Sequence, residues 1–268
     1  NDFFALFLDP SMMYSSDIYK GKNMDLEEAS LHKLEVICQK LNLSDTDKVI
    51  EIGSGWGGFA IYAAKKYGCH VTTTTLSKQQ YQYVKAKISQ LKLDKKITVL
   101  LKDYRDLEGS YDKLVSIEMI EAVGHHYYNS YFKVISQLLK ADGQALIQAI
   151  TIKDQRYKQA IKSIDFIQKY IFPGSCIPSL TAIQNSLTHS TDLVINQVDD
   201  IGHHYAVTLQ QWRENFVMNL AKIHKLGFDD YFTRMWIFYL CYCEGGFLER
   251  SISDLHIHIT KPNHRNRI

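Results

Sequence analysis

The chain has 268 residues, 46% of them hydrophobic, and its 31 basic and 29 acidic side chains leave a formal net charge of +2. This size and composition allow a large core, in one large domain or two small ones. The balanced charge argues against a nucleic-acid-binding surface, and no apolar run reaches the roughly 18 residues of a membrane span. We therefore expect a soluble, cytoplasmic globular protein with no nucleic-acid partner. An upstream domain is left open, because the chain does not begin with Met.

The first half of the chain alternates between helix and strand patterns. Asp25 and Glu28 form a capping box that opens a helix reaching about Leu43. Further elements follow in chain order, with strands predicted over 48–52, 69–75, 97–102, 113–117 and 144–150, and helices over 58–68, 77–93 and 127–140. Strands that alternate with helices form a parallel sheet with helices on both faces.

From about Asp154 the pattern changes to helices, which are predicted over 154–172 and 208–250. Segment 191–202 interrupts the two helical stretches, and a short strand over 255–260 follows them. We interpret this part as helices added to one α/β domain. The first of these helices carries an apolar face made of Tyr157, Ala160, Ile161, Ile164, Ile167 and Ile171, with Lys158, Lys162 and Lys169 elsewhere. Such a face is usually core. In an added layer it equally fits a tunnel lining or a surface that touches lipid headgroups.

Cysteine and histidine patterns give no metal or disulfide signal. The five cysteines are odd in number and irregularly spaced, which argues against a disulfide framework and fits a reducing cytosol. Cys241-x-Cys243 lacks a second ligand pair, so a packing role is favoured. The pairs His125-His126 and His203-His204 have no Asp, Glu or Cys beside them at ligand spacing. We expect no metal, and nothing indicates an oligomeric state.

Gly53, Gly55 and Gly58 stand in the spacing G-x-G-x-x-G directly after the strand over 48–52. A glycine-rich turn at this place lets backbone N–H groups approach a dinucleotide or another nucleotide-like cofactor, or it is simply a tight turn. A dinucleotide site would need an acid about 20 residues further on, at the end of the second strand. That strand ends in TTTTLS, whereas an acid, Glu51, precedes the glycines. Nicotinamide binding is therefore disfavoured.

Blocks along nearly the whole chain point to a more specific assignment. They are FFALFLDPSMMYSS, VIEIGSGWGG, TLSKQQ, LLKDYRDL, VSIEMIEAVGHHYY, KYIFPGSCIPS, HYAVTLQQW and YCEGGF. In content and order they resemble S-adenosylmethionine-dependent methyltransferases, specifically the cyclopropane-fatty-acyl-phospholipid synthases and mycolic acid cyclopropane synthases. The resemblance implies an α/β fold of the class I methyltransferase type, with a Rossmann-like seven-stranded sheet in a single catalytic domain over 1–268. It also implies an inserted helical cap, mainly within 154–250, that builds an acyl tunnel.

The resemblance implies which residues hold S-adenosylmethionine. Gly53 and Gly55 bring backbone close to the methionine part, with Glu51 just before them, and other residues match positions along the nucleoside or above it. These are Thr75, Leu76 and Gln80 at the ribose, Asp103, Tyr104, Arg105 and Ile117 at the adenine, and Tyr14 and Ser15 closing over the cofactor. Ser77-x-x-Gln80 also reads as a helix capping box.

The family transfers the methyl group to a cis double bond and then removes a proton, a step for which bicarbonate is the proposed base. The resemblance implies that this anion is held here by Glu121, Tyr205, Gln148, Ser16 and the backbone of Ile150. Three positions depart from the family pattern: Gln148 replaces a histidine, Ala122 replaces another, and Ser16 replaces a cysteine. Because Gln cannot become cationic, we expect an anion to be held less strongly. Glu121 as a helix cap and Tyr205 as a packing residue remain alternatives.

The implied activity is methylene transfer to the double bond of an unsaturated fatty acyl chain of a membrane phospholipid, giving a cyclopropane. An altered base site at Gln148 leaves open a methyl-branched or methylene product instead. A non-catalytic lipid-binding protein is a third, less favoured interpretation. We expect transient contact with the anionic inner face of the membrane. The acyl length and the carrier are not specified.

Overall fold

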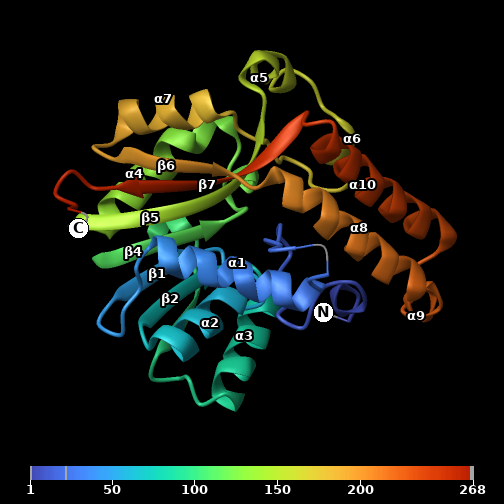
Figure 1. Ribbon diagram of the computed structural model, residues 1–268, viewed down its shortest axis with the longest axis horizontal. Helices are drawn as coiled ribbons and strands as arrows, with labels where there is room; N and C mark the ends of the chain where they lie inside the picture. The colour runs from blue at the N-terminus through green and yellow to red at the C-terminus, as the bar shows by residue number, and fades with distance from the viewer. Residues whose placement is uncertain (1, 22, 266–268) are drawn as a thin grey trace.

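The computed structural model describes residues 2–21 and 23–265, and these form a mixed sheet flanked by helices (Figure 1). The described residues contain a seven-stranded sheet in the order β3-β2-β1-β4-β5-β7-β6. The strands are β1 (Lys48–Ile52), β2 (His70–Thr75), β3 (Ile97–Leu101), β4 (Tyr111–Ile117), β5 (Leu139–Ile152), β6 (Val194–Asp200) and β7 (Ile252–Thr260). Only β7 is antiparallel to both of its neighbours, β5 and β6. The alternation of elements predicted the parallel part but not this reversed strand.

Helices cover both faces of the sheet, as Figure 1 shows. They are α1 (Leu26–Lys40), α2 (Gly58–Tyr67), α3 (Lys78–Gln90), α4 (Tyr128–Leu138), α5 (Asp154–Ala160), α6 (Phe166–Tyr170), α7 (Leu180–Ser190), α8 (Gly202–Met218), α9 (Leu220–Lys225) and α10 (Asp230–Leu248). Alternate strand residues enter separate cores: Val49 and Leu146 pack with α1, α2 and α3, whereas Ile50 and Ile147 pack with α4 and α7. Successive side chains of a strand point to opposite faces of the sheet, so a strand covered on both faces contributes to both cores.

The start of a helix was predicted correctly where the sequence contains a recognised capping box. The Asp25 carboxylate accepts from the backbone N–H of Glu28 at 2.8 Å, and α1 begins there as predicted. The predicted helix over 154–172 is wrong as one unit, because α5 ends at Ala160 and a new capping box of Asp165 with Gln168 opens α6. The segment over 208–250 likewise divides into α8, α9 and α10. The sequence analysis missed α7 and left β6 unassigned.

The helices α8 and α10 form a cap with the N-terminal segment, residues 2–21, which lies against them in Figure 1. Their shared core is largely aromatic, and it is made of residues such as Phe7, Tyr205, Trp212, Trp236 and Tyr239. Side-chain amides of α8 and the residue after it fasten the segment: Asn215 donates to the carbonyl of Phe7 at 3.2 Å, and Asn219 to that of Leu6 at 2.9 Å. The chain start therefore belongs structurally to the cap.

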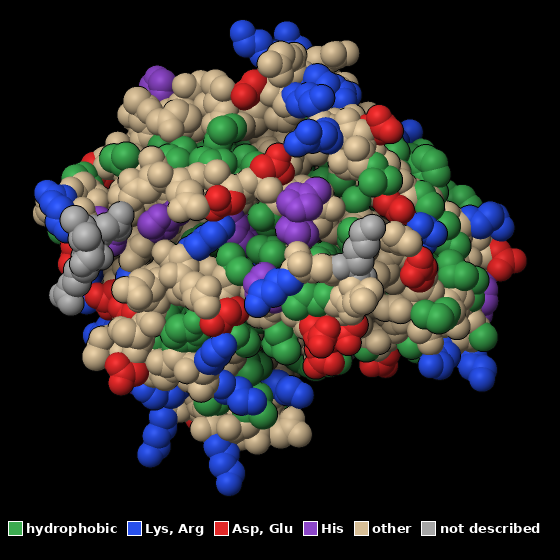
Figure 2. Space-filling view, viewed as in Figure 1, with side chains coloured by type: hydrophobic (Ala, Val, Ile, Leu, Met, Phe, Trp, Pro, Cys, Tyr) green, Lys and Arg blue, Asp and Glu red, His purple; other side chains and the backbone are tan. Residues whose placement is uncertain are grey.

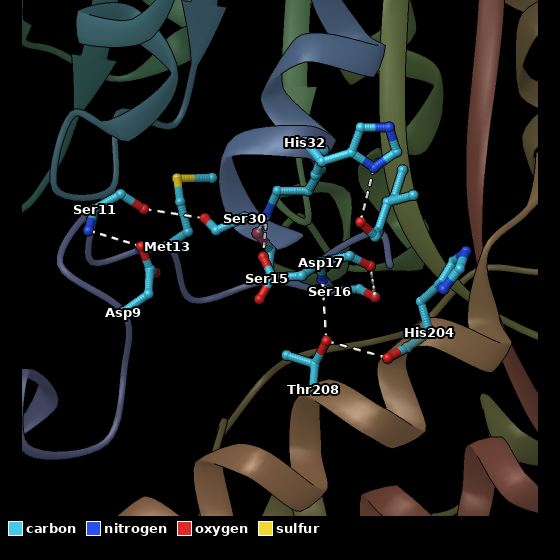
Figure 3. A network of polar contacts seen from close by, with 12 residues as sticks. Asp9, Ser11, Met13, Ser15, Ser16, Asp17, Ser30, His32, His204 and Thr208 are labelled. Atoms are coloured by element: carbon cyan, nitrogen blue, oxygen red, sulfur yellow. Dashed lines mark hydrogen bonds and ion pairs between the residues drawn. The ribbon is translucent and has the colours of Figure 1, made fainter. Parts of the chain in front are cut away.

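The next residues of that segment run between α1 and α8 and are held by the polar network in Figure 3. The backbone N–H of Asp17 donates to Thr208 Oγ1 at 3.2 Å. Lys33 Nζ donates to Ser15 Oγ at 2.6 Å and lies 3.5 Å from Asp17 Oδ1. Both members of this ion pair are buried. Burial raises the pKa of Asp17 to about 7, although Lys33 opposes the shift.

We predict that Lys33→Met destabilises the fold by about 3 kcal/mol at pH 8, since it leaves a buried carboxylate without its cation. At pH 5 the loss should be smaller, because the raised pKa keeps native Asp17 protonated there in both proteins. Urea unfolding at the two pH values measures this. The double variant Lys33→Met, Asp17→Asn should show no such pH difference, and an equal penalty at both pH values in the single variant would contradict the account.

Candidate active site

The glycine turn lies at the carboxyl end of β1 and opens toward empty space. Gly53 and Gly55 have φ values of 95° and 47°, a region that glycine adopts without strain. The backbone N–H groups of Gly53 and Ser54 donate to the carbonyl of Thr74, which anchors the turn to β2. A Cβ added at Gly55 would meet nothing within 4 Å, whereas at Gly58 it would collide with Met13 of the N-terminal segment. Gly55 therefore faces a free volume, and Gly58 serves packing.

The other predicted cofactor residues line the same edge of the sheet, because β3, β2, β1 and β4 are adjacent and parallel. At the end of β2, Leu76 is 71% exposed. Thr75 Oγ1 donates to Gln80 Oε1 at 2.7 Å, so the Gln80 side chain does not complete a capping box, although Ser77 does cap α3. At the end of β3, Asp103 accepts hydrogen bonds from Arg105.

Three of the predicted cofactor residues lie deeper. Tyr104 packs edge-on against Tyr131 with ring centroids 5.6 Å apart, and Ile117 is half-buried at the end of β4. Glu51 is only 2% exposed and accepts from Thr73 Oγ1 at 2.6 Å. Burial raises the pKa of Glu51 to about 8. The structure thus places this carboxyl beneath the turn, where it is bonded to β2, and not on the open edge.

The N-terminal segment brings Tyr14, Ser15 and Ser16 beside the ends of the strands. Tyr14 Oη lies 2.9 Å from Tyr239 Oη, and its ring lies 5.2 Å from that of Trp212. Ser15 is held by Lys33, as described above. Ser16 is buried, and its backbone N–H donates into the interior. These contacts place the segment between the glycine turn and the cap.

The group that receives the Ser16 N–H is a carboxylate that the sequence analysis did not single out, that of Glu118. Glu118 Oε1 accepts from Ser16 N at 2.8 Å and from Gln148 Nε2 at 2.9 Å. Its Oε2 accepts from Tyr205 Oη at 2.7 Å. Glu118 follows β4 directly and has a φ of 47°, which is uncommon for a residue other than glycine. Three residues predicted to form the site thus converge on one side chain.

Gln148 is oriented by polar groups on neighbouring strands. Its Nε2 also donates to Asp254 Oδ2 at 2.8 Å, and its Oε1 lies 3.2 Å from His256 Nε2. His256 Nδ1 lies 3.0 Å from Lys40 Nζ, which pairs with Asp199 at 2.7 Å. Burial and the nearby Lys40 lower the pKa of His256 well below its usual value, so the ring is neutral. A neutral ring that accepts from Lys40 carries its proton on Nε2 and donates to Gln148.

Glu121 occupies the adjacent position. Its Oε1 accepts from the backbone N–H of Ile150 at 2.6 Å, so the carboxyl binds β5 and does not cap a helix. Its Oε2 is buried and has no hydrogen-bond partner among the described residues. Burial and the neighbouring Glu118 raise the pKa of Glu121 to about 8. Glu121 and Ile150 therefore come together as the resemblance implied.

The site holds the carboxyl groups of Glu118, Glu121 and Asp254, which differ in how readily they ionise. Burial raises the pKa of each, and the charge of Glu118 raises those of the other two. Glu118 accepts from Ser16, Gln148 and Tyr205, and hydrogen bonds to the charged form favour it. We therefore assign the single negative charge at neutral pH to Glu118. Asp254 is fully buried, whereas Glu118 keeps intermediate exposure.

Sequence reasoning missed Glu118, Asp254 and His256. The block IEMIEAVG contains Glu118 three residues before Glu121, and the alternating polar residues of SDLHIHIT mark one face of β7. Those were the available signals. Among the described residues no group of three or more His, Cys, Asp or Glu side chains is placed to hold a metal ion.

The amino-acid sequence of the chain matches a known protein family. The profile of the family described as mycolic acid cyclopropane synthetase matches residues 1–257. Tuberculostearic acid methyltransferase UfaA1 of Mycobacterium tuberculosis is 37% identical over 254 residues, which cover 92% of this chain and 59% of that protein. Cyclopropane-fatty-acyl-phospholipid synthase of Escherichia coli K12 is 37% identical over 253 residues, covering 94% of this chain and 63% of that protein. The chain thus spans about three fifths of the length of these relatives.

Solved structures agree with the sequence matches. The cyclopropane synthase MmaA2 from Mycobacterium tuberculosis superposes with a TM-score of 0.90 at 26% identity, covering 97% of this chain and 94% of that one. Mycolic acid cyclopropane synthase CmaA1, complexed with SAH and CTAB, also gives a TM-score of 0.90, at 28% identity and the same coverage. The seven-stranded methyltransferase fold is confirmed, and the chain belongs to the mycolic acid cyclopropane synthetase family of methyltransferases.

Proposed function

We propose that the chain transfers a methyl group from S-adenosylmethionine to the cis double bond of an unsaturated fatty acyl chain of a membrane phospholipid and converts the bond to a cyclopropane. The observation that carries the proposal is the placement of the Glu118 carboxyl group, which accepts three hydrogen bonds, among aromatic side chains and near the open glycine turn. The solved relative that is complexed with SAH supports the choice of methyl donor. A non-catalytic lipid carrier would have no use for that carboxylate.

The residues of the open edge fit the donor. Gly55 leaves room for a ligand against the backbone, and Leu76 offers an exposed apolar surface to a nucleoside. When bound, S-adenosylmethionine supplies an electrophilic methyl group on a sulfonium. A cis alkene is a weak nucleophile, so the protein must hold it in line with that methyl and exclude water. The N-terminal segment, fixed over the strand ends by Lys33 and Thr208, provides such a cover.

Methyl transfer to an alkene leaves a carbocation on the acyl chain, and the cap offers aromatic faces to stabilise it. Tyr205 stacks on Phe247 with centroids 4.4 Å apart, and its ring lies 6.1 Å from Trp212. Tyr14 packs against Trp212 with centroids 5.2 Å apart, and its hydroxyl lies 2.9 Å from that of Tyr239. The indole N–H groups of Trp212 and Trp236 are buried without hydrogen-bond partners among the described residues, which marks the region as apolar. We propose that the acyl chain enters through this aromatic part of the cap.

The fate of the cation decides the product, and the relatives carry names for different outcomes. Loss of a proton from the transferred methyl closes the ring, or gives a methylene branch after a hydride shift along the chain. Loss of a chain proton gives a methyl-branched alkene. A saturated methyl branch would also need a hydride donor. We place the cyclopropane first and the methylene or methyl-branched alkene second.

Labelled methyl donor tests this chemistry. With S-adenosylmethionine whose methyl carries three deuterium atoms, the lipid product should retain two, because ring closure removes one from the methyl group. Mass spectrometry of the released fatty acids reads the count, and catalytic hydrogenation under mild conditions then separates a ring from a methylene. Retention of all three deuterium atoms would contradict cyclopropane and methylene formation and favour the methyl-branched alkene.

Binding of the donor can be tested at the glycine turn. Gly55→Val should lower the affinity for S-adenosylhomocysteine at least ~10-fold, since its Cβ meets no protein atom within 4 Å and projects toward the proposed ligand volume. The matched control is Gly227→Val, because Gly227 also has a positive φ and open space around it but lies between α9 and α10. Calorimetry and thermal unfolding compare the two. Equal stability losses with unchanged affinity in both variants would contradict the assignment, as would heat from NADH.

We propose that segment 155–172, which contains most of α5 and all of α6, contacts a lipid surface. Tyr157, Ile167 and Ile171 are half-buried against the cores, so only part of the apolar face is free to meet lipid. Ile164 is 77% exposed, Tyr170 48% and Phe172 40%, with Lys158, Lys162 and Lys169 exposed among them. Figure 2 also shows hydrophobic side chains on the surface over α8 and α10. No described helix is long and apolar enough to cross a bilayer. We propose transient binding to the anionic cytoplasmic face of the membrane.

Vesicle sedimentation tests the surface. Binding to phosphatidylglycerol vesicles should exceed binding to phosphatidylcholine vesicles and weaken with salt. Changing Lys158, Lys162 and Lys169 to Gln together should reduce it on the order of 100-fold, at about 1 kcal/mol per cation. Ile164→Ser should also weaken it. Val194→Ser is the control, since Val194 is 52% exposed but lies at the start of β6, at the edge of the sheet. Unchanged binding in the triple variant would contradict this assignment.

A further inference from the structure

The groups that the family resemblance assigns to a bicarbonate ion are already bonded within the chain. Ser16 N, Gln148 Nε2 and Tyr205 Oη all donate to Glu118, at 2.8, 2.9 and 2.7 Å. Ile150 N donates to Glu121. Carboxylate and bicarbonate both present a planar pair of oxygens that share a negative charge. The side chain of Glu118 thus stands where the separate anion would bind.

A second anion does not fit this arrangement. It would have to displace Glu118 from its donors and then lie beside that charge and the carboxyl groups of Glu121 and Asp254, in a region of low dielectric where like charges repel strongly. The cation whose charge acts on Glu118 is Lys33, and it is already paired with Asp17, while Lys40 reaches the site only through His256 and Gln148. The residues present therefore do not fit bicarbonate.

The backbone at Glu118 points the same way. A φ of 47° is unfavourable for a residue with a Cβ, and such strain persists where the surroundings impose it. The imposing contacts are the hydrogen bonds just described, together with the bond from Glu118 N to the carbonyl of Gln148 at 2.8 Å. Glycine would adopt this conformation freely and would leave the donors open.

We propose that the carboxylate of Glu118 replaces bicarbonate in this protein and is itself the base that accepts the proton from the methylated acyl chain. The inference rests on the proposed function. The alkene π electrons form a bond to the methyl carbon, and the sulfur–carbon bond breaks with its electron pair remaining on sulfur. A methyl C–H bond then breaks, its electron pair closes the ring onto the cationic carbon, and the proton moves to a Glu118 oxygen. That proton returns to solvent before the next turnover.

This assignment explains why Gln stands at position 148. Its amide nitrogen has two hydrogens, and they reach Glu118 and Asp254 at 2.9 and 2.8 Å, while its oxygen faces His256. A neutral histidine has one N–H and could not serve both carboxyl groups from one nitrogen. Gln148 is thus a positioning residue for the Glu118 carboxylate, and the departure from the family pattern at 148 follows from the carboxylate at 118.

The first test is anion binding, which needs no lipid turnover. Carbon-13-labelled bicarbonate is titrated by NMR into the wild type, Glu118→Gly and the surface control Glu108→Gly, each saturated with S-adenosylhomocysteine. Saturable binding should appear only in Glu118→Gly, where glycine suits the backbone and the three donors are free. Saturable binding at the wild-type site, or none in a folded Glu118→Gly, would overturn the inference.

The second test is turnover in buffer stripped of carbonate. The wild type should keep its rate, and Glu118→Gln should lose on the order of 100-fold or more, without rescue, because the amide fills the site but is no base. Glu118→Gly should regain at least ~10-fold on addition of bicarbonate or formate. A carbonate-dependent wild type, or a Glu118→Gln rate near that of the wild type, would overturn the inference. If the wild type methylates no acyl chain, the proposed function fails, and the anion titration still decides the role of Glu118.

Discussion

The hydrogen bonding of the Glu118 carboxylate is the constraint that joins the parts of this molecule. Its donors come from the N-terminal segment, from β5 and from α8, and they lie 102, 30 and 87 residues away in the sequence. Hydrogen bonds to an ionised acceptor in a poorly solvated site are about twice as strong as neutral ones. The position of the segment over the strand ends and the position of the cap over the sheet therefore depend on the same charge.

The site contains three carboxyl groups close together, and we assign a negative charge to only one of them, Glu118. Glu121 and Asp254 are pushed toward their neutral forms by burial and by Glu118, so the polar cluster avoids multiple negative charges. The amide of Gln148 links Glu118 to a neutral His256 and, beyond it, to Lys40 near the surface. In this arrangement Glu118 serves as the base, so no anion has to bind from solvent. The position of the base relative to its hydrogen-bond donors is set when the protein folds.

Local patterns predicted much of the fold and of the cofactor edge. The glycine turn and the capping box of α1 are each encoded within a few neighbouring residues, whereas Thr75 and Asp103 at the strand ends were implied by the family resemblance. Glu118 could not be found in this way, because its partners are distant in sequence and its backbone conformation is invisible before folding. Hydrophobic periodicity alone predicted α5 and α6 as one helix, because it takes no account of the capping box at Asp165 that begins α6. The sequence also could not show that Glu51, just before the glycines, is bonded to Thr73 of the neighbouring strand.

The central claim is that the wild-type site holds the carboxylate of Glu118 where the family resemblance implied a separate anion. A crystal structure of the wild type with S-adenosylhomocysteine, grown in bicarbonate buffer, tests this most directly. The account predicts the Glu118 oxygens at about 3 Å from Ser16 N, Gln148 Nε2 and Tyr205 Oη, with no separate anion among them. A planar three-oxygen ion on those donors, with the Glu118 side chain turned away, would contradict it.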